Sequence, residues 1–180
     1  MNITVYLGSS LGNSDGFISA IKQLGTFIGQ RGDTLVYGGS KIGLMGILAD
    51  SVLASGGAVI GVEPQMFIDK ELQHNDITEL IVTKDMSERK AKMIELGDAF
   101  IAFPGGIGTL EEISEIMALV SLKIIDSPCI VYNLDGYYDS LKELLNTMLS
   151  YDLSSEQKQE SIHFVSSLSE IEEILNGKGK

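Results

Sequence analysis

The sequence has little of what marks several classes of protein. Its 180 residues include one cysteine, Cys129, which excludes a disulfide-stabilised scaffold and is typical of a reducing, cytoplasmic compartment. The longest unbroken apolar runs are five residues, as in residues 99–103, whereas a membrane-spanning helix needs roughly 20. No basic residue precedes Lys22, so we expect no secretory signal. These features predict a cytoplasmic protein without a membrane partner.

Positive charge is also scarce. The chain has 13 basic and 25 acidic residues, which give a formal net charge of −12. Nucleic acids and anionic membranes are bound by basic surfaces, so neither is expected as a partner. A small phosphate ligand remains compatible with this balance, because salt screens a distant acidic surface beyond a Debye length of roughly 8 Å.

Apolar residues, by contrast, make up 44% of the chain, which is enough for a substantial core in one domain. Short continuous apolar segments alternate with longer segments of helical periodicity. Strands are expected at residues 3–7, 34–37, 58–62, 79–82, 99–103 and 129–132, and helices at 17–30, 43–55, 86–96, 109–122, 137–149 and 168–175. Continuous apolar strands are typical of a parallel sheet covered by helices on both faces. The sequence therefore predicts an α/β fold with a doubly wound parallel sheet, in one domain over residues 1–180 with a frayed tail from about residue 176.

Glycine is concentrated where three of the expected strands end. Glycine-rich turns follow at residues 7–12, 37–46 and 103–109. Glycine lets the backbone approach a ligand closely, and the N-terminus of a following helix attracts phosphate. No turn has the dinucleotide fingerprint or a Walker ending. Each turn alone fits a tight connection that binds nothing, but three of them together favour a phosphate or nucleotide site.

Two cations occupy unexpected positions in the helix expected at residues 86–96. With 100° per residue, Arg89 and Lys90 fall within the apolar arc of this helix. Such side chains either pack their stems and extend their charges to water, or they form an anion site. In the second case the arginine fork grips a phosphate or a carboxylate.

Acidic side chains follow the third glycine-rich turn. Glu112 lies between apolar positions of the helix expected there, whereas Glu111 lies away from its main apolar stripe. The spacing of Thr109 and Glu112 also fits a capping box, in which the glutamate bonds back to the helix N-terminus. A capped carboxylate beside a phosphate loop is also a placed carboxylate, so both interpretations can hold. The same spacing at Asp85 and Glu88 is interpreted as structural.

The sequence offers no spacing typical of a metal site. His74, His163 and Cys129 are not placed as metal ligands, so we expect no metal, and no cofactor either. Cys129 begins an apolar strand and is interpreted as a core residue rather than a nucleophile.

Three motifs together resemble those of one family. They are Tyr37-Gly38-Gly39 with Gly43-Leu44-Met45-Gly46, then Met86-Ser87-Glu88-Arg89-Lys90-Ala91-Lys92-Met93, and Pro104-Gly105-Gly106-Ile107-Gly108-Thr109-Leu110-Glu111-Glu112. In these motifs, and over residues 8 to about 138, the chain resembles the LOG (LONELY GUY) family of cytokinin riboside 5′-monophosphate phosphoribohydrolases, often labelled lysine decarboxylase-like.

This resemblance implies a Rossmann-like, three-layer α/β/α nucleotide-binding domain that forms a homodimer. The implied reaction hydrolyses the N-glycosidic bond of a nucleoside 5′-monophosphate, such as a cytokinin riboside monophosphate or AMP, to free base and ribose 5-phosphate. The implied catalytic pair is Arg89 and Glu112. We expect the substrate to be bound by Ser9, Gly38, Gly39, Glu71, Lys90, Gly105, Gly106, Ile107, Gly108, Thr109, Leu110 and Glu111.

Cleavage of a ribosyl bond passes through an oxocarbenium-like state, which a nearby carboxylate stabilises. We assign this role to Glu112, with the glycine loop on the 5′-phosphate and Arg89 as a clamp on the ligand. Glu71, which begins a Glu-x-x-His stretch of the family, and Glu111 are alternative candidates for a second acid or base.

The chain departs from the family pattern at a few positions. Ser40 stands where the family usually has a third glycine, Ser87 where it has a histidine, and residues 118–121 where many members have Thr-Trp-Ala-Gln. These changes concern the preferred base and the pocket near the dimer contact. They leave Arg89 and Glu112 unchanged.

Alternatives from other classes remain. A non-catalytic carrier of a nucleotide or of the molybdenum cofactor would share the fold type, but Arg89 together with Glu112 favours an enzyme. Lysine decarboxylation requires a Schiff-base lysine and an acidic partner for a pyridoxal ring, and the sequence offers no such set. The segment 109–125 is apolar on several faces, which fits either a dimer interface or burial within one subunit.

Overall fold

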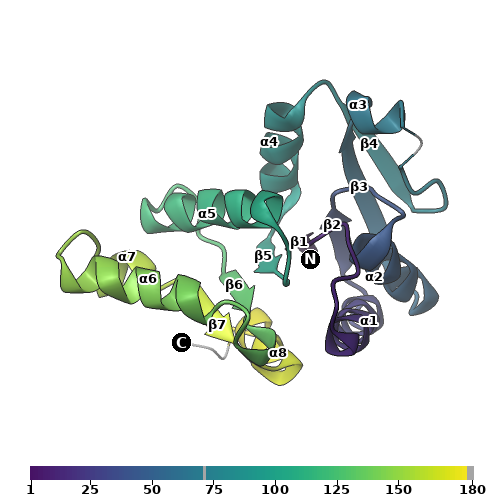
Figure 1. Cartoon of the computed structure of the whole chain (residues 1–180). Coiled ribbons are helices and arrows are strands. Elements are labelled where there is room, and N and C mark those ends of the chain that lie inside the picture. The colour runs from purple at the N-terminus through teal and green to yellow at the C-terminus, as the bar shows by residue number, and fades with distance from the viewer. Residues whose placement is uncertain (71, 178–180) are drawn as a thin grey trace.

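The computed structural model describes residues 1–70 and 72–177, and its centre is a seven-stranded sheet (Figure 1). The strands lie in the order β4-β3-β2-β1-β5-β6-β7, and every neighbouring pair is parallel. They are β1 (Asn2–Tyr6), β2 (Thr34–Tyr37), β3 (Ala58–Pro64), β4 (Glu79–Thr83), β5 (Ala99–Ala102), β6 (Cys129–Tyr132) and β7 (Ile162–Val165). The predicted parallel sheet is confirmed, and its six expected strands are present within two residues of their predicted bounds.

The helices connect the strands in the alternating order that the sequence predicts. They are α1 (Asp15–Gln30), α2 (Gly43–Ala54), α3 (Gln65–Ile68), α4 (Met86–Leu96), α5 (Ile107–Ser121), the 3₁₀ turn η1 (Leu134–Gly136), α6 (Asp139–Ser150), α7 (Glu156–Gln159) and α8 (Leu168–Leu175). The short α3, η1 and α7 were not predicted, and neither was β7. Four-residue helices are too short for a periodic pattern, and β7 is only half-buried over its first three residues.

Two apolar clusters lie on the two faces of the sheet. One contains side chains of α1, α2 and α8, and the other contains side chains of α4, α5 and α6. Figure 1 shows α1 and α2 on the opposite side of the molecule from α4 and α5. Both faces of the central strands are therefore buried, as their continuous apolar runs predict. The expected three-layer α/β/α arrangement is confirmed.

The strand order places a switch point beside β1. After β1 the chain turns to α1 on one face of the sheet, and after the neighbouring β5 it turns to α5 on the other face. The two loops therefore diverge and open a crevice at the carboxyl ends of these strands. In open α/β sheets, ligands bind in a crevice of this kind.

Other sequence expectations concern the core and the chain end. Cys129 is fully buried in β6, and burial raises the pKa of its thiol to about 12, so its interpretation as a core residue is confirmed. The frayed tail falls partly on residues 178–180, which lie outside the described residues. In the described part of the chain, no helix combines the length and hydropathy needed to cross a membrane.

Candidate active site

The first and third glycine-rich turns touch at the switch point. A Cβ atom on Gly8 would lie 3.3 Å from Gly105 Cα, and one on Gly105 would lie 2.8 Å from the Gly8 nitrogen and would overlap Thr109. Two backbones meet this closely only where neither carries a side chain. The contact brings the loop after β1 against the beginning of α5.

A cavity of about 340 Å³ opens beside this contact. All three glycine-rich turns contribute to it, together with the end of β3, helix α3 and one side of α4. It is lined by Leu7, Gly8, Ser9, Gly38, Ser40, Met45, Glu63, Phe67, Leu72, Met86, Arg89, Gly106, Gly108, Thr109, Glu111 and Glu112. The three turns therefore form one site, as their shared position after parallel strands suggests.

An ion pair between α4 and α5 lies at the cavity wall. Arg89 Nη1 is 3.2 Å from Glu112 Oε1, and each residue is only 7% exposed. Arg89 Nε donates a hydrogen bond to the Val62 carbonyl at 3.1 Å, which fixes the guanidinium across the end of β3. Burial raises the pKa of Glu112, and the Arg89 charge opposes that rise. Because a buried guanidinium without a counter-charge is costly, the pair favours the charged form of Glu112.

The beginning of α5 is shaped to receive an anion. Its N-cap residue is Gly106, which has no side chain to cap the helix, and its first turn holds no acidic residue. The N–H groups of this turn therefore lack the usual capping partners, and the helix dipole adds positive potential. A phosphate at this end would take their place.

The proposed capping box at this helix is wrong. The helix begins at Ile107, two residues earlier than expected, so Thr109 lies within its first turn and is not its N-cap. Glu112 consequently lies in the second turn, where it pairs with Arg89. The interpretation of Asp85 and Glu88 as structural fits the geometry: Asp85 Oδ1 accepts from the Glu88 N–H, and Glu88 Oε2 accepts from the Lys84 N–H.

Two tyrosines from the segment before α6 support the third turn from behind. Tyr137 donates its hydroxyl to the Gly105 carbonyl at 2.6 Å, and Tyr138 donates to the Phe103 carbonyl at 2.9 Å. These bonds satisfy carbonyl groups at the end of β5 and in the turn, and so fix the peptide planes that precede α5. No local sequence pattern predicts this contact, because it joins residues more than 30 positions apart.

Several residues expected to bind the substrate do not line this cavity. Ile107 is 81% exposed, and Leu110 lines a second groove between α5 and α6. Gly39 and Gly105 are not among the lining residues. Gly39 has φ +85°, and its carbonyl accepts a hydrogen bond from the His74 N–H. Glu71, the alternative second carboxylate, lies outside the described residues.

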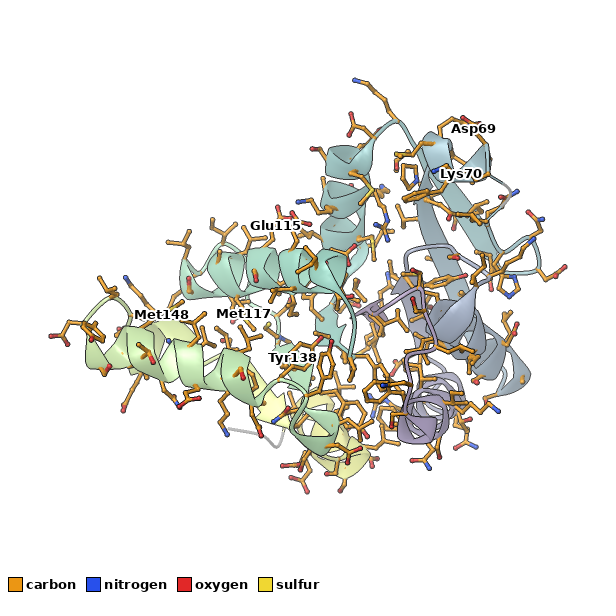
Figure 2. The ribbon with its side chains drawn as sticks, in the orientation of Figure 1. Asp69, Lys70, Glu115, Met117, Tyr138 and Met148 are labelled. Carbon is orange, nitrogen blue, oxygen red and sulfur yellow. The ribbon has the colours of Figure 1, made fainter. Side chains whose placement is uncertain are left out.

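Lys90 does not line the cavity itself, but it contacts Glu111, which does. Its ammonium group forms ion pairs with Glu111 and, at 3.1 Å, with Glu115. Hydrogen bonds to these two carboxylates raise the pKa of Lys90. Figure 2 shows Glu115 on the side of α5 that faces α4. Of the two cations in the apolar arc, Arg89 is thus part of the site, while Lys90 joins α4 to α5 beside it.

Glu63 also lies in the cavity wall and was not predicted from the sequence. This residue is 1% exposed, and its Oε2 has no hydrogen-bond partner among the described residues. Burial raises its pKa to about 7, although Arg89 opposes the rise. The signal was present in Gly61-Val62-Glu63-Pro64, where a single carboxyl interrupts an apolar strand at its carboxyl end.

The tight fit around Arg89 yields a prediction for Gly38→Ala. A Cβ atom at this position would overlap Arg89 Nη2, so the guanidinium must shift from the position in which it pairs with Glu112. We expect a fall in kcat/KM of about 10²-fold, the scale of a misplacement of about 1 Å, measured by initial rates of base release. The control is Gly16→Ala on α1, outside the cavity, and equal rates for the two variants would contradict this role of Gly38.

Comparisons with known proteins identify relatives of this chain. A family model described as "Possible lysine decarboxylase" matches residues 45–175. A "Probable cytokinin riboside 5'-monophosphate phosphoribohydrolase" of Oryza sativa subsp. japonica is 44% identical over 80% of this chain and 65% of the relative, so the chain spans slightly less than two thirds of that protein. A cytokinin riboside 5'-monophosphate phosphoribohydrolase of Rhodococcoides fascians is 43% identical over 78% of this chain and 71% of the relative.

Solved structures share the architecture at lower identity. The molybdenum cofactor binding protein from Rippkaea orientalis is 23% identical with a TM-score of 0.72, and the match covers 98% of this chain and 95% of that one. A Moco carrier protein from Chlamydomonas reinhardtii is 19% identical with a TM-score of 0.71, covering 98% and 96%. These likenesses show the fold alone. Within the described residues, no group of three or more His, Cys, Asp or Glu side chains is arranged to hold a metal ion.

Proposed function

The chain belongs to the LOG family, and we propose that it hydrolyses the N-glycosidic bond of a nucleoside 5′-monophosphate to free base and ribose 5-phosphate. The observation that carries this proposal is the buried Arg89–Glu112 pair in a cavity that also contains the uncapped N-terminus of α5. The cavity thus combines a phosphate site with a fixed carboxylate. A phosphorylated riboside needs both in one place.

We expect the substrate to lie along the cavity as follows. The 5′-phosphate occupies the N-terminus of α5, where it accepts from the N–H groups of Gly108 and Thr109. Glu112 follows within about one further turn of the same helix, so the ribose carbon C1′ lies near its carboxylate. As the glycosidic bond breaks, positive charge develops at C1′, and Glu112 stabilises it and orients the attacking water. Phosphate binding supplies the energy that holds the ribose in this position.

Arg89 keeps this carboxylate in place. Its guanidinium is anchored to the Val62 carbonyl and to Glu112, so Glu112 has one fixed orientation before substrate arrives. Preorganised charge of this kind acts on the transition state without a reorganisation cost at the moment of reaction. Arg89 also brings positive charge into the cavity of an acidic protein.

The experiment for the proposed function is a chromatographic assay of base release. The purified protein is incubated with AMP, isopentenyl-adenosine monophosphate and other nucleoside 5′-monophosphates, and with the corresponding nucleosides that lack phosphate. We expect free base and ribose 5-phosphate from at least one nucleotide and far slower cleavage of its nucleoside. Tight binding of a nucleotide with no base release would instead indicate a carrier or binding protein.

We also propose that residues 1–180 act as one cytoplasmic nucleotide-binding domain and that two copies associate through α5 and α6. The groove between these helices has a volume of about 400 Å³ and contains Met117, Leu144 and Met148. Figure 2 places Met117 and Met148 in the space between the two helices. Beyond the groove, Leu122 and Leu153 are 65% and 79% exposed. Apolar surface of this kind on a helix pair is typical of an interface.

The dimer prediction is tested by light scattering coupled to gel filtration. We expect twice the 19.4 kDa mass of one chain. Leu144→Glu, which places a charge in the groove, is expected to yield the single-chain mass, because a buried unpaired carboxylate opposes association. Met66→Glu is the matched control, since Met66 is similarly exposed but lies on α3. A wild-type mass of one chain would remove the proposal.

A further inference from the structure

A second carboxyl group faces the same cavity from β3. Glu63 lines the cavity next to Phe67 and Leu72, yet it is 1% exposed and its Oε2 has no partner among the described residues. A buried carboxyl oxygen without a hydrogen bond is costly. We therefore expect a bound ligand to supply the hydrogen-bond partner that this carboxyl oxygen lacks.

Arg89 lies between the two carboxyl groups. It pairs with Glu112 through Nη1 and is anchored through Nε to Val62, the residue that precedes Glu63. Glu112 thus lies on the α5 side of the guanidinium, and Glu63 lies on the β3 side. Because the phosphate end of the cavity is at α5, the base of a bound nucleotide points toward the Glu63 end. Phe67 and Leu72, which also line the cavity, are apolar, as a purine face requires.

Burial raises the pKa of both carboxyl groups, but their pairing differs. Glu112 has a direct ion pair with Arg89, which favours its charged form. Glu63 has no ion pair within the described part of the chain, and burial raises its pKa to about 7 against the opposing charge of Arg89. The other titratable group facing it is Tyr37 of β2, whose own pKa is raised by burial and by the Glu63 charge. The β4 residue paired with Glu63 is the uncharged Val82. One carboxyl group thus has a direct ion pair, while the other has a buried oxygen without a partner among the described residues, an arrangement that suits a charged stabiliser and an acid in one site.

We propose that Glu63 is the general acid of this reaction and protonates the leaving base. The proposal rests on the proposed function. The bond between C1′ and the base nitrogen breaks, and its electron pair leaves with the base. The Glu63 Oε2 proton moves to a ring nitrogen of the base, which departs neutral. Water adds to C1′ and gives its proton to Glu112. Proton exchange with solvent then restores Glu63 as the acid and Glu112 as the carboxylate.

The test compares two leaving groups in Glu63→Gln. With AMP, whose base needs a proton to leave, we expect a loss of kcat of about 10²- to 10³-fold, within the usual range for a general acid. With p-nitrophenyl ribofuranoside 5-phosphate, whose leaving group departs as a stable anion, we expect a loss of less than about tenfold, because no proton is required. Equal losses with both substrates would overturn the proposal.

The pH profile is the second and independent readout. The wild type needs Glu63 protonated, so kcat for AMP is expected to fall as pH rises through about 7. Glu63→Gln is expected to lack this basic limb, and Glu63→Ile is expected to lack it too. A wild-type profile that stays flat from pH 6 to 8.5, or an unchanged limb in both variants, would overturn the proposal even if the nitrophenyl substrate is not cleaved.

Matched controls separate this proposal from the proposed function. Glu79→Gln, on the exposed first residue of β4, is expected to keep wild-type rates and the wild-type pH profile. Thermal unfolding of Glu63→Gln checks that the isosteric variant is folded. If the wild type releases no base from any nucleotide, the proposed function fails. If it releases base and Glu63→Gln retains the wild-type rate on AMP, only the role of Glu63 fails.

Discussion

Glu112→Gln is expected to lower kcat for the preferred nucleotide by about 10³-fold while the nucleotide still binds. The amide has the shape of the carboxylate but carries no charge, so it cannot stabilise positive charge at C1′ or accept a proton from water. Phosphate binding depends on the N-terminus of α5, which this substitution leaves intact. The loss should therefore fall on kcat and not on the dissociation constant. Base release measures the first, and calorimetric titration with AMP measures the second.

The control for this variant is Glu172→Gln, on an exposed position of α8 at the other face of the sheet. It removes the same charge from the same type of side chain outside the cavity, and wild-type kinetics are expected. A wild-type rate for Glu112→Gln would disprove the assignment of Glu112. A loss of both binding and turnover would indicate a structural contribution to the phosphate site instead.

Arg89→Met is expected to destabilise the fold as well as stop the reaction. The substitution leaves the Glu112 carboxylate 7% exposed and without its counter-charge. Removing one member of a buried pair costs about 3–5 kcal/mol, which corresponds to a fall in Tm of roughly 10 °C for a chain of this size. Unfolding in urea and thermal scanning measure the loss. The loss of stability should be smaller at pH 5 than at pH 8. Without Arg89 the charge that chiefly opposes the raised pKa of Glu112 is gone, so at pH 5 this carboxyl can take up a proton and is then no longer an unpaired charge.

The double variant Arg89→Met with Glu112→Leu provides the sharper comparison. Replacing both charges with apolar side chains of similar size leaves no unpaired charge, so most of the stability should return while activity stays absent. A double variant no more stable than Arg89→Met would show that the ion pair is not the source of the loss. A single variant with wild-type Tm would show that Glu112 is not a buried carboxylate in the wild type.

The sheet and its main helices follow directly from the sequence. The strands of the sheet centre are continuous apolar runs because both of their faces are buried, and local pattern is then sufficient. Strand β7 was not predicted, because it lies at the edge of the sheet, is only half-buried and includes the polar His163. The beginning of α5 at Ile107 was not predicted either, because Ile107 is exposed and Gly108 has low helix propensity.

For the site, the sequence by itself determined that glycine-rich turns follow three parallel strands and that Arg89 and Glu112 lie on or beside apolar helix faces. The three turns line one cavity because the parallel sheet brings the carboxyl ends of its strands to one edge. Only the tertiary structure decided between a capping glutamate and an ion pair at Glu112, because that choice depends on a partner 23 positions earlier in the chain. Whether a side chain is buried, and which group it pairs with, depends on contacts between segments that are distant in the sequence. For the same reason, the role of Lys90 beside the cavity and the unpartnered oxygen of Glu63 became visible only once β3, α4 and α5 were packed together.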